Sequence, residues 1–387
     1  MSKERSQGLL LLGIILISIN LRTSIASVGP LIPFIREDLG ISNGLAGSLT
    51  TLTLFTFAVF SLFSPGIGKR IGNGRAIFLG ITILSIGVII RVFGGVELLF
   101  FGTALTGIGI VIANVLMIPF FKAHLPEKLG LLTAILSTGM SLFAAIASGV
   151  SVPLAVDLGL GWRGSLASWV VLMILALAVW FPQAAAKPSP KSEIELAGKN
   201  VWKSKLAWQV TLFMGAQSVM YFTMVTWLPD MLIFKGMSPV ASGIALSYMQ
   251  LISLIGTFFA PGILMKLRQQ QGVILGVSIG YLFGYSLLFG EQQWLIYLAL
   301  TIIGIGSGAS LSIAYTLISL RTLEDQTTSK LSGMVQSAGY ILAALGPLLF
   351  GVSLDLVGNW DFLNWFLLIM TIQFLVFGWG AGKDRKI

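Results

Sequence analysis

Long apolar runs alternate with short polar breaks over the whole chain. A helix that crosses a membrane needs about 20 mostly apolar residues to span about 30 Å of hydrocarbon, and the runs have that length. Membrane-spanning strands would show segments of about ten residues with alternating polarity, which this sequence lacks. The pattern therefore predicts an all-α integral membrane protein with twelve transmembrane helices. They lie near residues 8–33, 44–66, 75–93, 98–120, 129–156, 165–181, 206–229, 242–265, 272–290, 294–317, 331–354 and 362–381.

Composition supports the membrane assignment and removes several classes of function. Of the residues, 56% are hydrophobic and only 10% are charged, whereas a soluble domain carries about 25% charged residues. The chain has no cysteine, which excludes a disulfide framework, a thiol nucleophile, a zinc site with cysteine ligands and an iron–sulfur cluster. It has one histidine, His124, which we expect to be a solvated loop residue. We expect neither a metal nor a cofactor.

The net charge of +9 is explained by membrane topology better than by nucleic-acid binding. Lys and Arg concentrate in alternate loops, and cytoplasmic loops of membrane proteins carry the excess of these residues. On the opposite side fall only Arg36, Arg91, Arg163 and Lys235. The pattern predicts a multi-pass protein of the cell membrane with both termini in the cytoplasm. The expected partners are the lipid bilayer and a small-molecule substrate, without nucleic acid, and the expected state is a monomer.

The longest polar break separates two similar halves. Residues 182–205 contain Pro, Lys and Ser with little apolar content, which is typical of a flexible linker. At an offset of 196 residues, Pro33 aligns with Pro229 and Pro65 with Pro261. Ordered matches of this kind indicate an internal duplication. The predicted domains are a six-helix bundle at 1–181, a cytoplasmic linker at 182–205 and a second six-helix bundle at 206–387.

Several stretches spread over the chain carry a resemblance to a known family. They are NLRTSIASVGPLIP at 20–33, NVLMIPFFKAHLP at 114–126, GWRGSLASW at 161–169, GAQSVMYF with WLPDML at 215–232, and LSGMVQSAGYILAALGP at 331–347. In these stretches the chain resembles the major facilitator superfamily, and most closely its cyanate and 2-nitroimidazole transporter family (CynX/NimT). The resemblance implies the major facilitator fold, in which two halves rock around a site near the middle of the membrane. It also implies transport of cyanate-like anions or export of neutral nitroaromatic heterocycles.

One loop departs from the family's pattern. The superfamily's loop between helices two and three usually reads Gly-x-x-x-Asp-Arg-x-Gly-Arg-Arg, whereas this chain has PGIGKRIGNGR at 65–75. Lys69 occupies the position of the acid, so the charge relay usually inferred for that acid lacks its carboxylate here. Arg70, Gly72 and Arg75 match the pattern, and the resemblance implies that they belong to a gating loop.

Arg22 is the one charged residue that cannot be assigned to a loop. Counted from Gly8 at about 1.5 Å per residue, it lies roughly 21 Å into the membrane. An arginine at the centre of a membrane helix costs about 2.5–3.5 kcal/mol, and no acid remains inside the membrane to pair with it. It either satisfies carbonyls at the end of its helix, or snorkels outward, or supplies positive charge to an anionic or polar substrate, for which its fork of donors is suited.

Polar residues inside the spans complete the candidate substrate site. Asn20, Ser24 and Ser27 share one face of the first helix, and such a face borders either a cavity or a tight seam between helices. Helices seven and eleven share a Gln-x-x-x-Tyr pattern, which places an amide and a phenol on one face. Because polar groups are expensive in lipid, we expect them inside the bundle, as substrate contacts or as hydrogen bonds between helices. The pairs are Gln217 with Tyr221 and Gln336 with Tyr340, and the weaker candidates are Ser24, Asn114, Tyr248, Gln250 and Tyr315.

Two further features favour structural interpretations. The glycine runs at 102–110 and 304–310 lie inside apolar spans with no preceding strand, which favours close helix packing over a dinucleotide site. Trp227 opens the WLPDML stretch near the predicted outer surface, a position typical of an interfacial anchor.

These observations favour a secondary transporter over an enzyme. All Asp and Glu residues are assigned to loops and no Walker phosphate loop is present, so neither paired-carboxylate catalysis nor ATP-driven transport is supported. The leading hypothesis is alternating-access transport of a small anion or compact polar solute of the cyanate-like class, with Arg22 as the anchor. The alternative is efflux of neutral nitroaromatic or drug-like heterocycles, stacked on tyrosine faces. Two other classes of protein stay open as alternatives, a non-transporting membrane sensor and a channel. Whether transport is coupled to protons also stays open.

Overall fold

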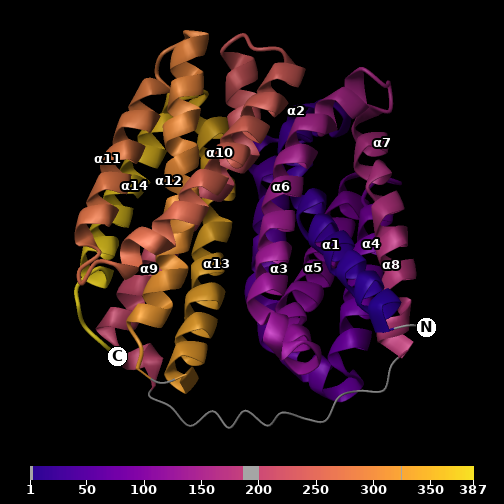
Figure 1. Ribbon diagram of the computed structural model, residues 1–387. Helices are drawn as coiled ribbons and strands as arrows, with labels where there is room; N and C mark the ends of the chain where they lie inside the picture. The colour runs from indigo at the N-terminus through magenta and orange to yellow at the C-terminus, as the bar shows by residue number, and fades with distance from the viewer. Residues whose placement is uncertain (1–2, 186–199, 324) are drawn as a thin grey trace. The chain divides into compact units, whose positions relative to one another are not determined.

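The computed structural model describes residues 3–185, 200–323 and 325–387, and the regular elements in these ranges are all helices (Figure 1). Three short 3-10 turns lie at Gly29–Leu31, Pro126–Lys128 and Val201–Lys203. The α-helices are α1 (Lys3–Ala26), α2 (Ile32–Leu39), α3 (Asn43–Ile71), α4 (Asn73–Ile90), α5 (Val96–His124), α6 (Leu129–Val156), α7 (Gly161–Ser168), α8 (Val170–Ala185), α9 (Lys205–Phe234), α10 (Pro239–Met265), α11 (Gln271–Leu287), α12 (Gln293–Leu320), α13 (Asp325–Val357) and α14 (Asp361–Ala381).

The helices account for the predicted membrane spans. Within the described residues, ten helical segments are long and apolar enough to cross a membrane. Two more predicted spans coincide with α11, which has 17 residues, and with α9, which has 30 residues. The predicted all-α membrane architecture is therefore confirmed.

Local sequence signals explain where several helices begin and end. Ser204 and Ser238 cap α9 and α10, since each hydroxyl accepts a hydrogen bond from the backbone N–H three residues later. Side-chain caps of this kind satisfy N–H groups that have no partner inside the helix. Pro239 follows at the first position of α10, where its missing N–H is harmless.

The chain divides into two compact units. Unit 1 comprises Met1–Ile41 and Leu52–Glu193, and unit 2 comprises Ser42–Thr51 and Ile194–Ile387. The helix α3 is shared, because its first turns belong to unit 2 and the rest belongs to unit 1. Of the predicted linker at 182–205, residues 186–199 lie outside the described residues. The proposed boundaries of the two six-helix bundles stay a prediction.

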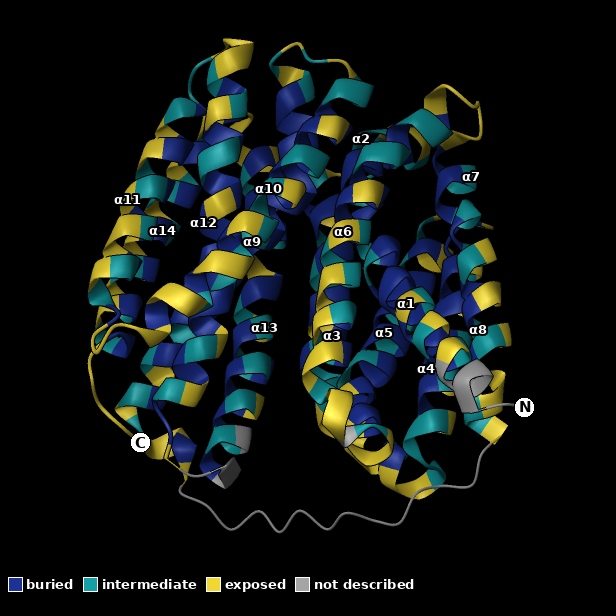
Figure 2. Ribbon diagram, in the orientation of Figure 1, coloured by how far each residue is buried: buried dark blue, intermediate teal, exposed yellow. Residues whose placement is uncertain are grey.

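Glycines allow the helices to approach closely within each unit. In unit 1, a Cβ on Gly80 of α4 would lie 2.8 Å from the carbonyl oxygen of Gly109 on α5. In unit 2, a Cβ on Gly304 of α12 would lie 2.7 Å from the carbonyl oxygen of Met249 on α10. These contacts confirm that the glycine runs serve helix packing, and Figure 2 shows buried residues concentrated along the facing sides of the helices within each unit.

Candidate functional site

Arg22 lies on α1 of unit 1, four residues before this helix ends. Its side chain is half-buried, and its guanidinium makes no hydrogen bond or ion pair with any residue that the structure describes. The five N–H donors of the group therefore stay available to a ligand.

Other residues satisfy the carbonyls at the end of α1. The Arg91 Nη1 atom donates to the carbonyl oxygen of Ser24 at 2.9 Å, and the Ser148 hydroxyl donates to that of Ala26 at 3.2 Å. The backbone N–H of Ser27 donates to the carbonyl oxygen of Thr23 at 3.1 Å. One interpretation of Arg22 was that it satisfies carbonyl groups at the end of its helix. In this structure Arg91 does so instead, and its positive charge lies at the negative end of the α1 dipole.

The opposite face of α1 joins helices inside unit 1. Asn20 is fully buried, and its Nδ2 atom donates to the carbonyl oxygens of Leu16 at 2.7 Å and of Leu172 on α8 at 3.0 Å. The buried Ser24 hydroxyl donates to the carbonyl oxygen of Asn20 at 3.0 Å. Because residues two positions apart face different sides of a helix, Asn20 and Ser24 do not share the face of Arg22. Their contact with substrate stays a prediction.

The two Gln-x-x-x-Tyr pairs come together in unit 2. Gln217 and Tyr221 lie on α9, and Gln336 and Tyr340 lie on the neighbouring α13. The ring of Phe222 lies between the two phenols, with centroid distances of 5.2 Å to Tyr221 and 6.4 Å to Tyr340, both edge to face. The Gln-x-x-x-Tyr pattern on both helices was visible in the sequence. The packing of α9 on α13 brings the two helices that carry it together.

Among the described residues, the amides of these pairs make only local hydrogen bonds to side chains. Gln217 is buried, and its Nε2 atom donates to the Ser218 hydroxyl at 2.7 Å. The Nε2 atom of the half-buried Gln336 donates to the Ser332 hydroxyl at 3.0 Å. Because each of these partners lies on the same helix as its glutamine, the bonds do not tie the helices together. The amides could exchange them for a ligand without separating α9 from α13.

The weaker candidates have diverse surroundings. The Tyr248 hydroxyl shares a hydrogen bond of 2.7 Å with the Thr301 hydroxyl, which joins α10 to α12. Gln250 is buried, Asn114 is half-buried, and Tyr315 is 43% exposed. The structure therefore gives Tyr248 a helix-to-helix bond, while a substrate role for all four residues stays a prediction.

The predicted gating loop joins α3 to α4. Gly72 has φ of 91° and ψ of 145°, a conformation that favours glycine because a side chain would clash. Arg70 is exposed in the last turn of α3, where a positive charge suits the helix dipole. Arg75 is also exposed, and its Nε atom donates to the carbonyl oxygen of Ala184 at 3.1 Å, which fastens the loop to the end of α8. Lys69, at the acid's position, is exposed.

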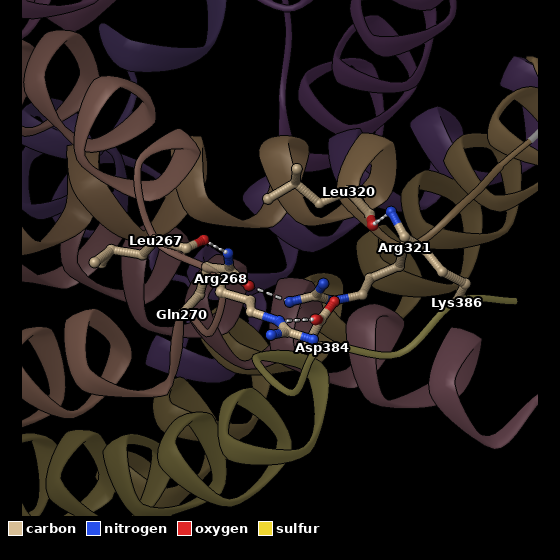
Figure 3. Close-up of polar contacts among 7 residues, drawn as sticks. All are labelled: Leu267, Arg268, Gln270, Leu320, Arg321, Asp384 and Lys386. Carbon is tan, nitrogen blue, oxygen red and sulfur yellow. Dashed lines mark hydrogen bonds and ion pairs between the residues drawn. The ribbon is translucent and has the colours of Figure 1, made fainter.

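A polar network missed by sequence reasoning lies in unit 2, around the loop before α11 (Figure 3). Arg321 is buried; its Nε atom donates to the carbonyl oxygen of Ala381 at 2.8 Å, and its Nη2 atom donates to Gln270 Oε1. Burial lowers the pKa of the Arg321 guanidinium, and the nearby Asp384 carboxylate opposes that shift. Asp384 also accepts from Arg268 Nε at 3.0 Å. The network fastens the ends of α12 and α14 to the loop before α11.

The structure corrects two assignments from the sequence, that of the aspartates Asp230 and Asp355 and that of Trp227. Asp230 and Asp355 were assigned to loops, but α9 and α13 extend past them, and Asp230 is only 5% exposed. Arg91 follows the last residue of α4, as assigned, but it is buried and only 1% exposed. Trp227 is not an interfacial anchor, because it is fully buried and its Nε1 atom donates to the carbonyl oxygen of Pro347 at 3.0 Å. An acid flanked by apolar residues at the end of a span was the signal that could have identified the two aspartates.

His124 is exposed, as expected, although it ends α5 and its ring stacks on Phe120 at 4.1 Å. Among the described residues, no three His, Asp or Glu side chains are placed to hold a metal ion.

Known proteins match nearly the whole chain. A family model described as Major Facilitator Superfamily matches residues 10–347. The uncharacterized transporter YycB of Bacillus subtilis (strain 168) is 43% identical over 98% of this chain and 94% of that protein. The 2-nitroimidazole transporter of Escherichia coli (strain K12) is 34% identical over 99% of this chain and 98% of that protein. The cyanate transport protein CynX of the same organism is 26% identical over 94% of this chain and 97% of that protein.

Solved structures share the fold at low sequence identity. A bacterial homolog to the human lysosomal transporter Spinster matches with a TM-score of 0.79 and 14% identity over 100% of both chains. A D-xylose-proton symporter matches with a TM-score of 0.77 and 17% identity over 100% of both chains. At these identities the likeness concerns the fold alone.

Proposed function

The chain belongs to the Major Facilitator Superfamily, and from this premise we propose that it is a secondary transporter of a small monovalent anion or compact polar solute of the cyanate-like class. Alternating access would carry the solute across the cell membrane, with both termini in the cytoplasm. The family and the relatives are transporters, and a relative named for cyanate transport supports the substrate class.

The observation that carries this proposal is the state of Arg22. Its half-buried guanidinium has no counter-charge or hydrogen-bond partner among the described residues. A guanidinium stays charged at all physiological pH values, and an unpaired charge in a membrane helix is costly. A bound anion would remove this cost by accepting from the guanidinium fork.

Unit 2 would supply the polar contacts that give shape selectivity. The Gln217 and Gln336 amides have hydrogen-bond partners only one to four residues away, so a ligand could replace these partners. Tyr221 and Tyr340 are half-buried and lie one helical turn from these amides. We propose each of these four residues, like Arg22 of unit 1, as a substrate-binding residue.

A second candidate function is efflux of neutral nitroaromatic heterocycles. The 34% identical relative named as a 2-nitroimidazole transporter favours it. The aromatic group of Tyr221, Phe222 and Tyr340 supports it as well, because aromatic faces stack on flat heterocycles. In this case Arg22 would not be needed to anchor the substrate.

The test compares purified wild type with Arg22→Ala and Arg22→Lys. Thermal unfolding is measured with cyanate, other small anions and 2-nitroimidazole, and uptake of the same solutes is measured in liposomes. Cyanate is expected to stabilise wild type, by about 2.7 kcal/mol at a concentration 100 times its Kd. Arg22→Ala is expected to lose this shift and the uptake, whereas Arg22→Lys keeps a weakened response because it keeps the charge without the fork.

The matched control is Arg385→Ala, which removes an exposed arginine outside the helices and is expected to respond as wild type does. Equal binding of 2-nitroimidazole by wild type and Arg22→Ala, with no response to anions in either, would overturn the anion proposal in favour of the efflux candidate.

A further inference from the structure

Arg91 is a buried cation inside unit 1, directly after the last residue of α4. Its Nη1 atom donates to the carbonyl oxygen of Ser24, whereas its Nε and Nη2 atoms have no hydrogen-bond partner among the described residues. No carboxylate among those residues forms an ion pair with it. Burial of a charge is costly unless the charge is paired and its donors are bonded. The part of the chain that the structure describes therefore leaves this guanidinium without a counter-charge.

The end of α1 carries further polar groups of this kind. Thr23 lies in the last turn of α1, Ser27 directly follows the helix, and both are fully buried. Their hydroxyls make no hydrogen bond to any described residue. Hydroxyls in helices commonly bond to the carbonyl oxygen four residues earlier, as the Ser24 hydroxyl does here. Two buried hydroxyls thus stay available at the same end of α1 that the Arg91 guanidinium contacts.

Other helices of unit 1 pack around this end of α1 and around Arg91. A Cβ on Gly102 of α5 would lie 2.5 Å from the Arg91 nitrogen, so the α5 backbone lies directly against Arg91. Thr106 lies one turn further along α5, and its buried hydroxyl also has no partner among the described residues. On α6, the Ser148 hydroxyl donates to the carbonyl oxygen of Ala26. All these residues belong to unit 1, so the arrangement is contained within one compact unit.

A small anion suits this combination of groups better than water does. A guanidinium stays protonated at physiological pH, and water could accept from its N–H groups without balancing its charge. The negative end of the α1 dipole supplies about half an elementary charge, and the Ser24 carbonyl reaches only one of the three guanidinium nitrogens. The available guanidinium N–H groups and hydroxyls are all donors, and a monatomic anion accepts hydrogen bonds from any direction.

We propose that Arg91, with the hydroxyls of Thr23 and Ser27, binds a chloride ion inside unit 1. The ion is a resident counter-charge that stabilises the unit, and it is not the transported solute. The site is separate from the proposed substrate contact of Arg22, because residues two positions apart, such as Arg22 and Ser24, face different sides of a helix. The inference therefore goes beyond the proposed function and does not depend on it.

The first measurement is the apparent Tm of the purified wild type as chloride replaces gluconate at constant ionic strength. A ligand that binds only the folded protein raises its stability with concentration, so the apparent Tm is expected to rise with chloride. Arg22→Ala is expected to show the same rise. Arg91→Gln keeps an N–H donor for the Ser24 carbonyl but carries no charge, and it is expected to show no rise.

Ser27→Ala tests the site in a protein that keeps Arg91, and it covers the case in which Arg91→Gln fails to fold. The measurement is equilibrium binding of radioactive chloride to the purified protein. Loss of one hydrogen bond to a charged ligand is expected to weaken binding about tenfold. A purely structural role of Arg91 predicts no change, because the Ser27 hydroxyl bonds to no described residue.

The matched control is Ser18→Ala on α1, whose buried hydroxyl donates to the carbonyl oxygen of Ile15 at 2.7 Å. It is expected to bind chloride as wild type does.

Two results would overturn the inference. The first is a wild type that binds no chloride and whose apparent Tm does not respond to it. The second is binding that is lost in Arg22→Ala and kept in Arg91→Gln, which would assign the anion to the proposed substrate contact instead. No transported solute enters these measurements, so uptake of cyanate by a protein that binds no chloride at Arg91 would contradict this site and leave the proposed function intact.

Discussion

Gly72 links α3 to α4 in a backbone conformation that other residues rarely adopt. Its φ of 91° with ψ of 145° lies where a Cβ clashes with the backbone, at a cost of about 1–3 kcal/mol. We expect Gly72→Ala to lower the apparent Tm of the purified protein, measured as the fraction that stays monodisperse after heating. The strain acts on the predicted gating loop, so liposome uptake should fall as well.

Gly66→Ala is the control for this prediction. Gly66 lies inside α3, and nothing is within 4 Å of the place where its Cβ would be. Alanine is favoured over glycine in a helix by up to about 1 kcal/mol, so this variant should keep or raise the apparent Tm. If both variants shift the apparent Tm downward by the same amount, the backbone conformation of Gly72 is not the cause.

The sequence identifies single residues best where their chemistry is out of place. Arg22 stood out because no loop could hold it, and the structure finds it half-buried on α1. Arg91 escaped notice because it lies at the end of a span, where sequence reasoning assigns a charge to solvent. Its burial depends on the end of α1, which presents the Ser24 carbonyl to it. This contact joins residues 67 positions apart, and no local pattern encodes it.

At the scale of elements, the pair of α4 and α5 depends on glycines that face backbone atoms. A Cβ on Gly80 would lie 2.8 Å from the Gly109 carbonyl oxygen and 2.9 Å from the Ala113 nitrogen. Backbone atoms of a packed helix cannot move aside, so Gly80→Ala should separate the helices and destabilise unit 1 by about 1–3 kcal/mol, as overpacking does. Thermal unfolding in detergent checks this, with a lower apparent Tm expected.

Gly276→Ala on α11 provides the comparison, because nothing lies within 4 Å of its added Cβ. Its apparent Tm should stay at or above that of wild type. A loss of stability as large as that of Gly80→Ala would show that helical glycines matter here for a reason other than close approach.

Helix ends were less predictable than helix positions. Hydropathy places each predicted span on a helix because lipid requires an apolar run of a certain length. It does not report where a helix continues beyond the lipid, and α9 and α13 continue to Phe234 and Val357. Asp230 and Asp355 lie in these extensions, which is why both were assigned to loops.

At the scale of the whole molecule, the duplication predicts two halves, but the contacts divide the chain differently. The predicted halves meet in the linker at 182–205, whereas unit 2 also contains Ser42–Thr51 of α3. The sequence offset cannot show this, because it compares segments without reporting which of them touch. The contacts of Asn43, Gly44 and Thr51 with α13 put the first turns of α3 into unit 2.

The orientation of the whole chain in the membrane is a prediction from charge, and the natural absence of cysteine permits a direct test. Single substitutions at four exposed positions report the side of a loop: Asp157→Cys, Gln292→Cys, Glu127→Cys and Gln269→Cys. The loops of Glu127 and Gln269 lie beside Lys122, Lys128, Lys266 and Arg268, and loops rich in Lys and Arg stay in the cytoplasm.

An impermeant maleimide applied to intact cells should therefore label the cysteines at 157 and 292, and should label those at 127 and 269 only after the cells are opened. Acidic residues contribute little to topology, so replacing Asp157 and Glu127 should not itself reorient the chain. Labelling of the cysteines at 127 and 269 in intact cells would show that the orientation of the chain is opposite to the predicted one. The basic loops of both units would then face outward, and the net charge of +9 would need an explanation other than the charge rule for membrane insertion.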